Sequence, residues 1–463
     1  MIRALRVLIP SSVLTLLISE IILIFLCYFA AGYFVTDIDP VVYFLYEGGW
    51  SRIAVLATLL LLSMYFSDLY GNVRVPSRIF LFQHLCLAIG ICFLAQALFS
   101  YLHRDWTVPA RIMLFGSGMA LFALFGWRVL FGLAVQKVIG FERVLFLGSS
   151  PIIPQIAHRL HERPELGFLV LGYLDEECDR PPLDGMAPRL GCLADLDQTV
   201  AALRPDRLVV AMRERRGRLP VNELIDIRFS GIQTEEVAHL YETAFLRVCA
   251  REIRPSHLVF SSELGPRKGV LHMQTLYSAV IAAVGLTLTA PLMAVIAILI
   301  RITSPGPVLL RQTRVGLHDK PFSVLKFRSM YADAEARTGA VWATENDPRI
   351  TPLGRWLRLL RFDELPQLIN VLRGEMAIVG PRPERPEFVQ TLNQEIPFYR
   401  QRHCIKPGIT GWAQINYRYG NTIEDTIVKL EYDLYYIKNM SATLDAFVIF
   451  HTVKTMLLFR GAR

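Results

Sequence analysis

The chain has 463 residues, which is enough for two or three domains that each bury a hydrophobic core. Its residues are 53% hydrophobic and only 19% charged, a balance that excludes an ordinary soluble protein and indicates a membrane protein. The formal net charge of +8 is typical of a protein that lies against anionic lipid or binds phosphate groups. Nucleic acid is a poor candidate partner, because the apolar residues are concentrated in membrane-length segments.

The first third of the chain contains four apolar segments, each long enough to cross a bilayer as a helix of roughly 20 residues. Basic residues lie before the first segment, between the second and third and after the fourth, whereas the first outer loop is acidic. Since basic loops stay in the cytoplasm, we predict a four-span helical bundle over residues 1–138 with both ends in the cytoplasm. Glu20 and Asp68 either mark a polar pathway or serve helix packing or snorkelling, and we favour the second interpretation. The predicted spans cover residues 12–35, 50–69, 79–102 and 111–135.

Residues 139–255 have the composition of a soluble α/β domain. Apolar runs at 143–148, 168–174 and 207–212 are typical of buried strands, and residues 152–161 have helical spacing. Strands that alternate with helices predict a parallel sheet, and hence a Rossmann-like domain in the cytoplasm. The turn at Gly148 lacks the G-x-G-x-x-G pattern, so a regulatory or scaffolding role is favoured over nucleotide binding.

A fifth apolar segment, residues 276–300, has basic residues on both sides. If it crossed the membrane, the basic last third of the chain would lie outside, against the positive-inside bias. Pro291, near its middle, removes a helix hydrogen bond and bends the axis. We therefore predict a re-entrant helix that enters and leaves by the same face; the alternative is a fifth, proline-kinked span.

Residues 256–463 carry the charged and glycine-containing motifs, and we predict a mainly α catalytic domain there. Asp363 and Glu364 are adjacent carboxylates, and cations nearby are expected to lower their pKa and keep them ionised. An ionised carboxylate can act as a nucleophile toward phosphorus, and paired carboxylates suit Mg²⁺. The alternative is a simple helix first-turn charge arrangement. Basic residues that could hold a diphosphate are Lys326, Arg328, Arg355, Arg358, Arg361 and Arg382.

Seven motifs carry a specific resemblance. In chain order they are SPGP (304–307), QTRVG (312–316), KFRSM (326–330), DPRIT (347–351), DELPQ (363–367), GPRP (380–383) and KPGITGWAQ (406–414). From about residue 270 onward, the chain resembles the bacterial sugar transferases that are monotopic phosphoglycosyl transferases. The preceding bundle and Rossmann-like domain look like the large members of that family, which prime exopolysaccharide or O-antigen assembly. The C-terminal end resembles the branch found at PEP-CTERM-associated exopolysaccharide loci.

The resemblance implies an activity and a location. Asp363 would attack the β-phosphate of a UDP-sugar, such as UDP-glucose or UDP-galactose, and undecaprenyl phosphate would then take the phosphosugar. Glu364 would help to hold Mg²⁺ together with Asp363. The protein would sit in the bacterial cytoplasmic membrane with its catalytic domain in the cytoplasm, and it could form a homodimer. The residues expected to bind substrate are Lys326, Arg328, Arg358, Arg361, Arg382, Gln312 and Arg314.

Two further features leave alternatives open. The family's membrane helix breaks at a Ser-Pro pair, which aligns here with Ala290 and Pro291, so the angle of the bend depends on the proline. The C-terminal segment 444–459 is expected to be an interfacial amphipathic helix or a helix docked on the globular core. The rival functions are a membrane-tethered enzyme that modifies sugar nucleotides, and a non-catalytic organiser of a polysaccharide export complex.

Overall fold

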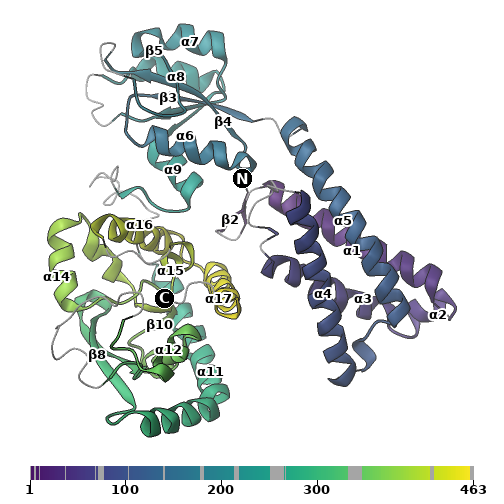
Figure 1. The fold of residues 1–463 in the computed structure, drawn as a ribbon. Helices are drawn as coiled ribbons and strands as arrows, with labels where there is room; N and C mark the ends of the chain where they lie inside the picture. The colour runs from purple at the N-terminus through teal and green to yellow at the C-terminus, as the bar shows by residue number, and fades with distance from the viewer. Residues whose placement is uncertain are drawn as a thin grey trace. The chain divides into compact units, whose positions relative to one another are not determined.

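The computed structural model is mostly helical and contains a five-stranded parallel sheet (Figure 1). Its contacts divide the chain into two compact units, one with Met1–Ile2 and Leu8–Val237, the other with Arg3–Val7 and Ala238–Arg463. Asp68 lies outside the described residues. The structure describes residues 2–4, 7–9, 11–36, 38–67, 69–70, 78–102, 104–138, 141–177, 182–212, 218–250, 265, 267–331, 347–417 and 422–458.

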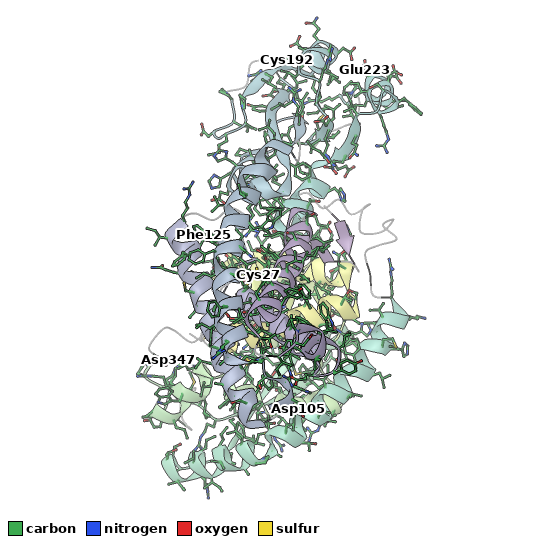
Figure 2. The ribbon with its side chains drawn as sticks, turned by 90° about the vertical axis from the view of Figure 1, so that its right-hand side faces the viewer. Cys27, Asp105, Phe125, Cys192, Glu223 and Asp347 are labelled. Carbon is green, nitrogen blue, oxygen red and sulfur yellow. The ribbon has the colours of Figure 1, made fainter. Side chains whose placement is uncertain are left out.

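The helices of the first third match the predicted apolar segments closely. Four of them, with the later helix α11 (Lys268–Thr303), are long and apolar enough to cross a membrane. Helix α1 packs along α5 and α3 along α4, around a core in which Cys27 is buried and against which Phe125 packs (Figure 2). The elements are β1 (Ile2–Ala4), β2 (Val7–Ile9), α1 (Ser11–Val35), α2 (Pro40–Leu45), α3 (Gly49–Phe66), α4 (Arg78–Leu102) and α5 (Ala110–Val138).

Glu20 forms a buried ion pair inside this bundle. Its carboxylate accepts hydrogen bonds from Arg128 Nε at 2.6 Å and Nη2 at 3.0 Å, and from the Tyr70 hydroxyl at 2.6 Å. Arg128 also donates to the carbonyl oxygen of Leu69 at 2.6 Å. The carboxylate thus joins α1, α5 and the segment after α3, which agrees with the packing role predicted for it.

Replacement of Glu20 alone is expected to destabilise the bundle strongly. Glu20→Leu leaves the Arg128 guanidinium buried without its counter-ion, a change that typically costs about 3–5 kcal/mol. Thermal unfolding in detergent should therefore show a large loss of stability. The double variant Glu20→Leu/Arg128→Leu removes both charges and is expected to recover most of that loss. If the single variant were as stable as the wild type, the pair would have no structural role.

The middle of the chain folds as the predicted parallel sheet, with strand order β5-β4-β3-β6-β7. Helices α7 and α8 cover one face, where Leu145 and Leu147 pack, and α6 lies on the other side (Figure 1). A Cβ at Gly148 would lie 2.6 Å from Met212 Cγ, so close packing against the end of β6 explains this glycine. The elements are β3 (Glu142–Leu147), α6 (Ile153–Glu162), β4 (Phe168–Asp175), β5 (Arg189–Cys192), α7 (Leu196–Leu203), β6 (Arg207–Val210), α8 (Val221–Phe229) and β7 (Gln233–Glu236).

The second unit begins with the helix that follows the sheet. In α9 (Val237–Phe245), the Tyr241 hydroxyl donates to Glu431 at 3.1 Å, and Glu242 pairs with Lys438 at 2.9 Å. The predicted boundary at residue 255 lies outside the described residues. The other elements are α11 (Lys268–Thr303), β8 (Leu309–Val315), β9 (Pro321–Phe327), α12 (Pro352–Leu359), η6 (Phe362–Glu364), α13 (Gln367–Leu372), β10 (Ala377–Val379), α14 (Pro386–Glu395), η7 (Tyr399–Cys404), β11 (Gly408–Thr410), α15 (Trp412–Asn416), α16 (Ile423–Asn439) and α17 (Ala442–Leu457).

Helix α11 packs on the same globular domain along both of its halves. Near its start, Gln274 Nε2 donates to Val379 O at 3.1 Å and to Asp445 Oδ2 at 2.9 Å. Near its end, Ile296 and Ile300 belong to a buried cluster with residues of β9 and α12. The chain stays helical on both sides of Pro291, and the helix bends along its length (Figure 1). Its other face is apolar and exposed, at Leu276, Val280, Val284, Leu288, Val295, Ile298 and Ile302.

Helix α17 is docked on the globular core. Leu444 and Val448 are buried in that core, and the Thr452 hydroxyl bonds to Thr410 of β11 at 2.7 Å. Asp445 accepts hydrogen bonds from side chains of α11 and α16, so α17 also fixes the first half of α11. This packing agrees with the docked alternative for the C-terminal segment.

Candidate active site

The two predicted catalytic carboxylates lie in a single helical turn, η6, between α12 and α13. Asp363 and Glu364 are both buried, with 9% and 8% of their surface exposed. Arg361, directly before the turn, has a φ of 55°, a left-handed conformation that is uncommon for a residue with a side chain. The turn therefore places two carboxylates inside the domain at the cost of local backbone strain.

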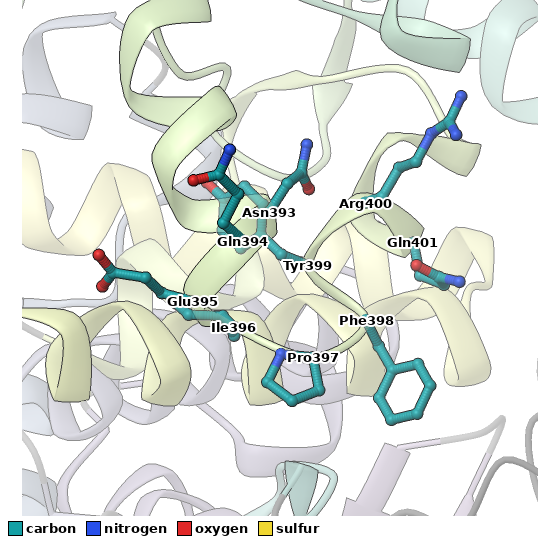
Figure 3. Close-up of a pocket in the computed structure, with 9 residues that line it drawn as sticks. All are labelled: Asn393, Gln394, Glu395, Ile396, Pro397, Phe398, Tyr399, Arg400 and Gln401. Atoms are coloured by element: carbon teal, nitrogen blue, oxygen red, sulfur yellow. The ribbon is translucent and has the colours of Figure 1, made fainter.

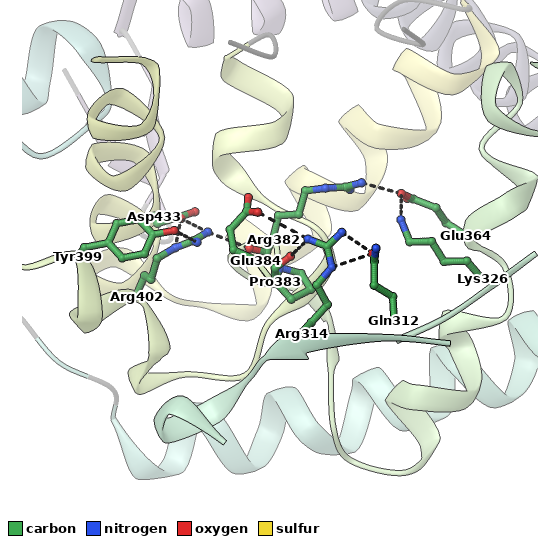
Figure 4. A network of polar contacts seen from close by, with 10 residues as sticks. All are labelled: Gln312, Arg314, Lys326, Glu364, Arg382, Pro383, Glu384, Tyr399, Arg402 and Asp433. Carbon is green, nitrogen blue, oxygen red and sulfur yellow. Dashed lines mark hydrogen bonds and ion pairs between the residues drawn. The ribbon is translucent and has the colours of Figure 1, made fainter. Parts of the chain in front are cut away.

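Glu364 receives most of the positive charge at the site. Its Oε1 pairs with Arg382 Nη2 at 2.9 Å and Lys326 Nζ at 3.3 Å, as Figure 4 shows, and its Oε2 lies 3.8 Å from Arg361 Nη1. Burial alone would raise the pKa of Glu364, but these three cations together hold the pKa well below its ordinary value. Glu364 is therefore ionised at neutral pH, as predicted.

Asp363 differs from its neighbour. It makes no hydrogen bond or ion pair with any residue in the described part of the chain. Burial and the adjacent Glu364 charge raise the pKa of Asp363 to about 6, although Lys326, Arg358 and Arg382 oppose the shift. The expectation that nearby cations lower both pKa values is thus wrong for Asp363, because the cations bond to Glu364. Its oxygens are left available to a ligand.

Two of the predicted substrate-binding arginines have structural partners. Arg328 donates to the Ser304 hydroxyl at 2.7 Å and to the Pro305 carbonyl oxygen at 2.9 Å, so it holds the loop that follows α11. Arg358 Nε donates to Ser329 Oγ at 2.9 Å, and its charge also acts on Asp363. Of the two, Arg358 has the more direct influence on the carboxylate pair.

Gln312 and Arg314 brace the turn that carries Arg382. Arg314 donates to Gln312 Oε1 at 2.6 Å and to the carbonyl oxygen of Pro383 at 3.1 Å (Figure 4). From the opposite side, Arg402 donates to the Arg382 carbonyl oxygen at 2.9 Å. These contacts hold the GPRP turn, and with it Arg382, in place. Gln312 and Arg314 therefore act on the site by positioning Arg382.

Two buried residues that hold the site together, Arg402 and Asn370, carry no signal in the sequence. Arg402 pairs with Asp433 at 2.9 Å, and no spacing signal links two residues that lie in different helices. Asn370 of α13 accepts from Leu325 N at 3.0 Å and donates to Ser323 O at 2.7 Å. Asn370 thereby holds strand β9, which carries Lys326, against α13.

Glycines allow the GPRP turn to approach β11 closely. A Cβ at Gly380 would lie 2.6 Å from Lys406 O and 2.8 Å from Gly408 N, and one at Gly411 would lie 2.2 Å from Gly380 O. Since these neighbours are backbone atoms, a side chain at Gly380 can fit only if the two segments separate. The GPRP and KPGITGWAQ motifs are thus parts of one packed crossing.

We predict that Gly380→Ala lowers both stability and activity. Overpacking of this kind typically costs about 1–3 kcal/mol, and displacement of the turn would move Arg382 away from Glu364. Thermal unfolding and turnover measure the two effects. Gly269→Ala is the matched control, because a Cβ there meets nothing within 4 Å. Equal stability of the two variants would contradict the proposed crossing.

Two hollows differ in their relation to this site. The larger, of about 460 Å³, is lined by residues 393–401, which run from the end of α14 into η7 (Figure 3). It contains none of the predicted site residues. A smaller cavity of about 170 Å³ is lined by Arg361 and Glu364 and by residues of α13, β11, α15 and α17. Buried carboxylates among cations are an arrangement suited to phosphate groups.

Comparisons with known proteins identify the family. Residues 270–459 match the family model for bacterial sugar transferases. UDP-glucose:undecaprenyl-phosphate glucose-1-phosphate transferase of Klebsiella pneumoniae is 36% identical over 321 residues, 67% of each chain. UDP-N-acetylgalactosamine-undecaprenyl-phosphate N-acetylgalactosaminephosphotransferase of Aeromonas hydrophila is 47% identical over 182 residues, 39% of this chain and 43% of the relative. The chain belongs to the bacterial sugar transferase family.

The similarity extends beyond the catalytic part in some relatives. The enzyme of Xanthomonas campestris pv. campestris, named a UDP-glucose:undecaprenyl-phosphate glucose-1-phosphate transferase, is 32% identical over 334 residues, 68% of this chain and 66% of the relative. The resemblance expected from the seven motifs is therefore confirmed at the level of the family.

Proposed function

We propose that the protein transfers a sugar 1-phosphate from a UDP-sugar to undecaprenyl phosphate, through a covalent intermediate on Asp363. The observation that carries this proposal is the division of roles between the paired carboxylates. Glu364 takes the ion pairs with Lys326 and Arg382, whereas the Asp363 oxygens have no partner among the described residues. A buried carboxylate that is mostly ionised at neutral pH and free of hydrogen bonds is a suitable nucleophile.

The transfer occurs in two steps, each of which forms one P–O bond and breaks another. An Asp363 oxygen attacks the β-phosphorus of the UDP-sugar, a P–O bond to the α-phosphate breaks, and UMP leaves. A phosphate oxygen of undecaprenyl phosphate then attacks the same phosphorus, which gives undecaprenyl-diphosphate-sugar and frees Asp363. Lys326, Arg358 and Arg382 stabilise the negative charge that develops in both steps. The covalent intermediate means that the two anionic substrates need not bind together.

The carboxylate pair fits Mg²⁺. The described residues contain no cluster of three or more His, Cys, Asp and Glu side chains suited to a metal. Mg²⁺, however, is commonly held by one or two carboxylates plus substrate phosphates and water. Asp363 and Glu364 would hold it, because burial and the adjacent Glu364 charge both raise the pKa of Asp363 and a divalent cation would offset them. When bound, the ion supplies positive charge for the diphosphate oxygens.

We further propose that α11 is re-entrant and that the site faces the cytoplasm of the bacterial inner membrane. Both halves of α11 pack on one charged, globular domain, which cannot lie on two sides of a bilayer. A straight helix of 36 residues would be about 54 Å long and would carry its ends far apart. With α11 re-entrant, α1, α3, α4 and α5 are the four spans. The regulatory or scaffolding role of the sheet domain, and a homodimer, remain predictions.

The test is donor turnover by purified protein. We expect UMP release from at least one donor in a panel of UDP-glucose, UDP-galactose and UDP-N-acetylgalactosamine, with the phosphosugar mass found on the peptide that contains Asp363. Addition of undecaprenyl phosphate should convert a single release into turnover, and EDTA should abolish it until Mg²⁺ is restored. No UMP release from any donor, with acceptor and Mg²⁺ present, would overturn the proposal.

A further inference from the structure

The cavity of about 170 Å³ joins a charged end to an apolar interior. Arg361 and Glu364 form its charged end, and Asp363 directly precedes Glu364 in the chain. The remaining walls come from Leu365 and from α13, β11, α15 and α17, and most of the surface that they present is apolar. Its apolar wall residues are Leu365, Leu368, Ile409, Ile415 and Met456.

The threonines of the cavity have used their hydroxyls elsewhere. Thr452 donates to the Val448 carbonyl oxygen at 2.7 Å and bonds to Thr410, and Thr455 donates to the His451 carbonyl oxygen at 2.8 Å. What remains for a ligand is chiefly their methyl groups. Gln414 is the polar exception, since its Oε1 is buried without a partner among the described residues. The interior therefore suits a hydrocarbon better than a sugar ring, whose hydroxyls need several partners.

The apolar wall continues to the membrane helix. Leu368 lies against α11, because a Cβ at Gly285 would be 3.4 Å from its Cδ1. Leu365 packs in the cluster of Ile296 and Ile300, on the other side of Pro291. Leu365 and Leu368, just before and within α13, thus line the cavity and also pack against α11. The apolar wall of the cavity is therefore continuous with the packing around the membrane helix.

Arg361 supplies the polar complement. Its left-handed backbone is strained, and such strain is found mainly at functional sites. Its ion pair with Glu364 is long, at 3.8 Å, and 28% of its side chain is exposed. A guanidinium held in this way at the mouth of an apolar cavity can exchange its partner for a phosphate, with two parallel hydrogen bonds.

We propose that this cavity binds the isoprene units next to the phosphate of the lipid acceptor, with Arg361 on the phosphate itself. The proposal rests on the function proposed above and assigns a place to its second substrate. Bound there, the phosphate lies beside Asp363, where it can attack the phosphosugar. The cavity thereby selects a lipid acceptor over water.

Met456→Trp fills the cavity, and Val453→Trp is the matched control on the exposed side of α17. In Met456→Trp, we expect the KM for undecaprenyl phosphate to rise at least tenfold, while UMP release without acceptor stays within twofold of wild type. The control should change neither. An unchanged KM would overturn the proposal. Loss of UMP release in a folded Met456→Trp protein would also overturn it, because the cavity would then bind the sugar of the donor.

A photolabelling experiment needs no catalysis and no variant that must fold. A geranyl phosphate with a diazirine on its first isoprene unit should label the wild-type protein within residues 409–415 or 452–456. Labelling there without UMP release from any donor would support the lipid site and reject the proposed function. UMP release with labelling only elsewhere would reject the lipid site and leave the function standing.

Discussion

Asp363→Asn is expected to abolish transfer, with a loss of about four orders of magnitude or more, the usual cost of removing a nucleophile. The amide has nearly the same shape as the carboxylate but cannot attack phosphorus. UMP release and the phosphosugar adduct should both disappear. Because Asp363 makes no hydrogen bond with described residues, its removal is expected to leave the melting temperature unchanged or slightly raised.

Glu424→Gln is the matched control for this loss, since Glu424 is an exposed carboxylate in the first turn of α16. It should retain full activity. The same comparison in cells separates the rival functions, because a non-catalytic organiser of export would still support polysaccharide production with Asp363→Asn. Production at the wild-type level would reject the role of Asp363 as nucleophile.

Arg382→Ala is expected to lower turnover about 10²–10³-fold, the typical effect of losing one preorganised donor at a developing charge. Arg382 donates to Glu364 at 2.9 Å, so the variant also frees a buried carboxylate. Arg382→Lys keeps the charge without the planar fork and should recover only part of the loss. Steady-state kinetics with a saturating donor measures the effect on kcat.

The control for Arg382 is Arg400→Ala. The Arg400 side chain is exposed and pairs with Asp319, and exposed ion pairs contribute little to stability. It is expected to be nearly silent in both stability and turnover. If Arg382→Ala proved equally silent, the rigid GPRP turn would have a purely structural role.

The sequence predicts the parts of this protein that depend on local pattern. Hydropathy located the helices of the first third, and short apolar runs located the strands of the parallel sheet. The adjacency of Asp363 and Glu364 marked the site before any contact was known. These features are visible because each is encoded within a few neighbouring residues.

The distribution of partners could not be predicted, because it depends on tertiary packing. Arg328 lies two residues from Lys326, yet only Lys326 reaches Glu364, because β9 ends at Phe327 and the Arg328 guanidinium bonds to the Ser304 and Pro305 segment instead. Arg382 reaches the same carboxylate from a distant turn. The unequal sharing of cations, which leaves Asp363 with a raised pKa, has no counterpart in the motif itself.

The pairing of Glu20 with Arg128 has a consequence for biogenesis. The two residues are 108 positions apart, so at ordinary rates of synthesis Glu20 waits roughly 5–20 s for its partner. During that time α1 holds an acidic side chain that hydrocarbon disfavours. In nascent chains that stop before α5, Glu20 never gains its Arg128 partner. We expect cellular quality control to degrade these chains faster than full-length protein.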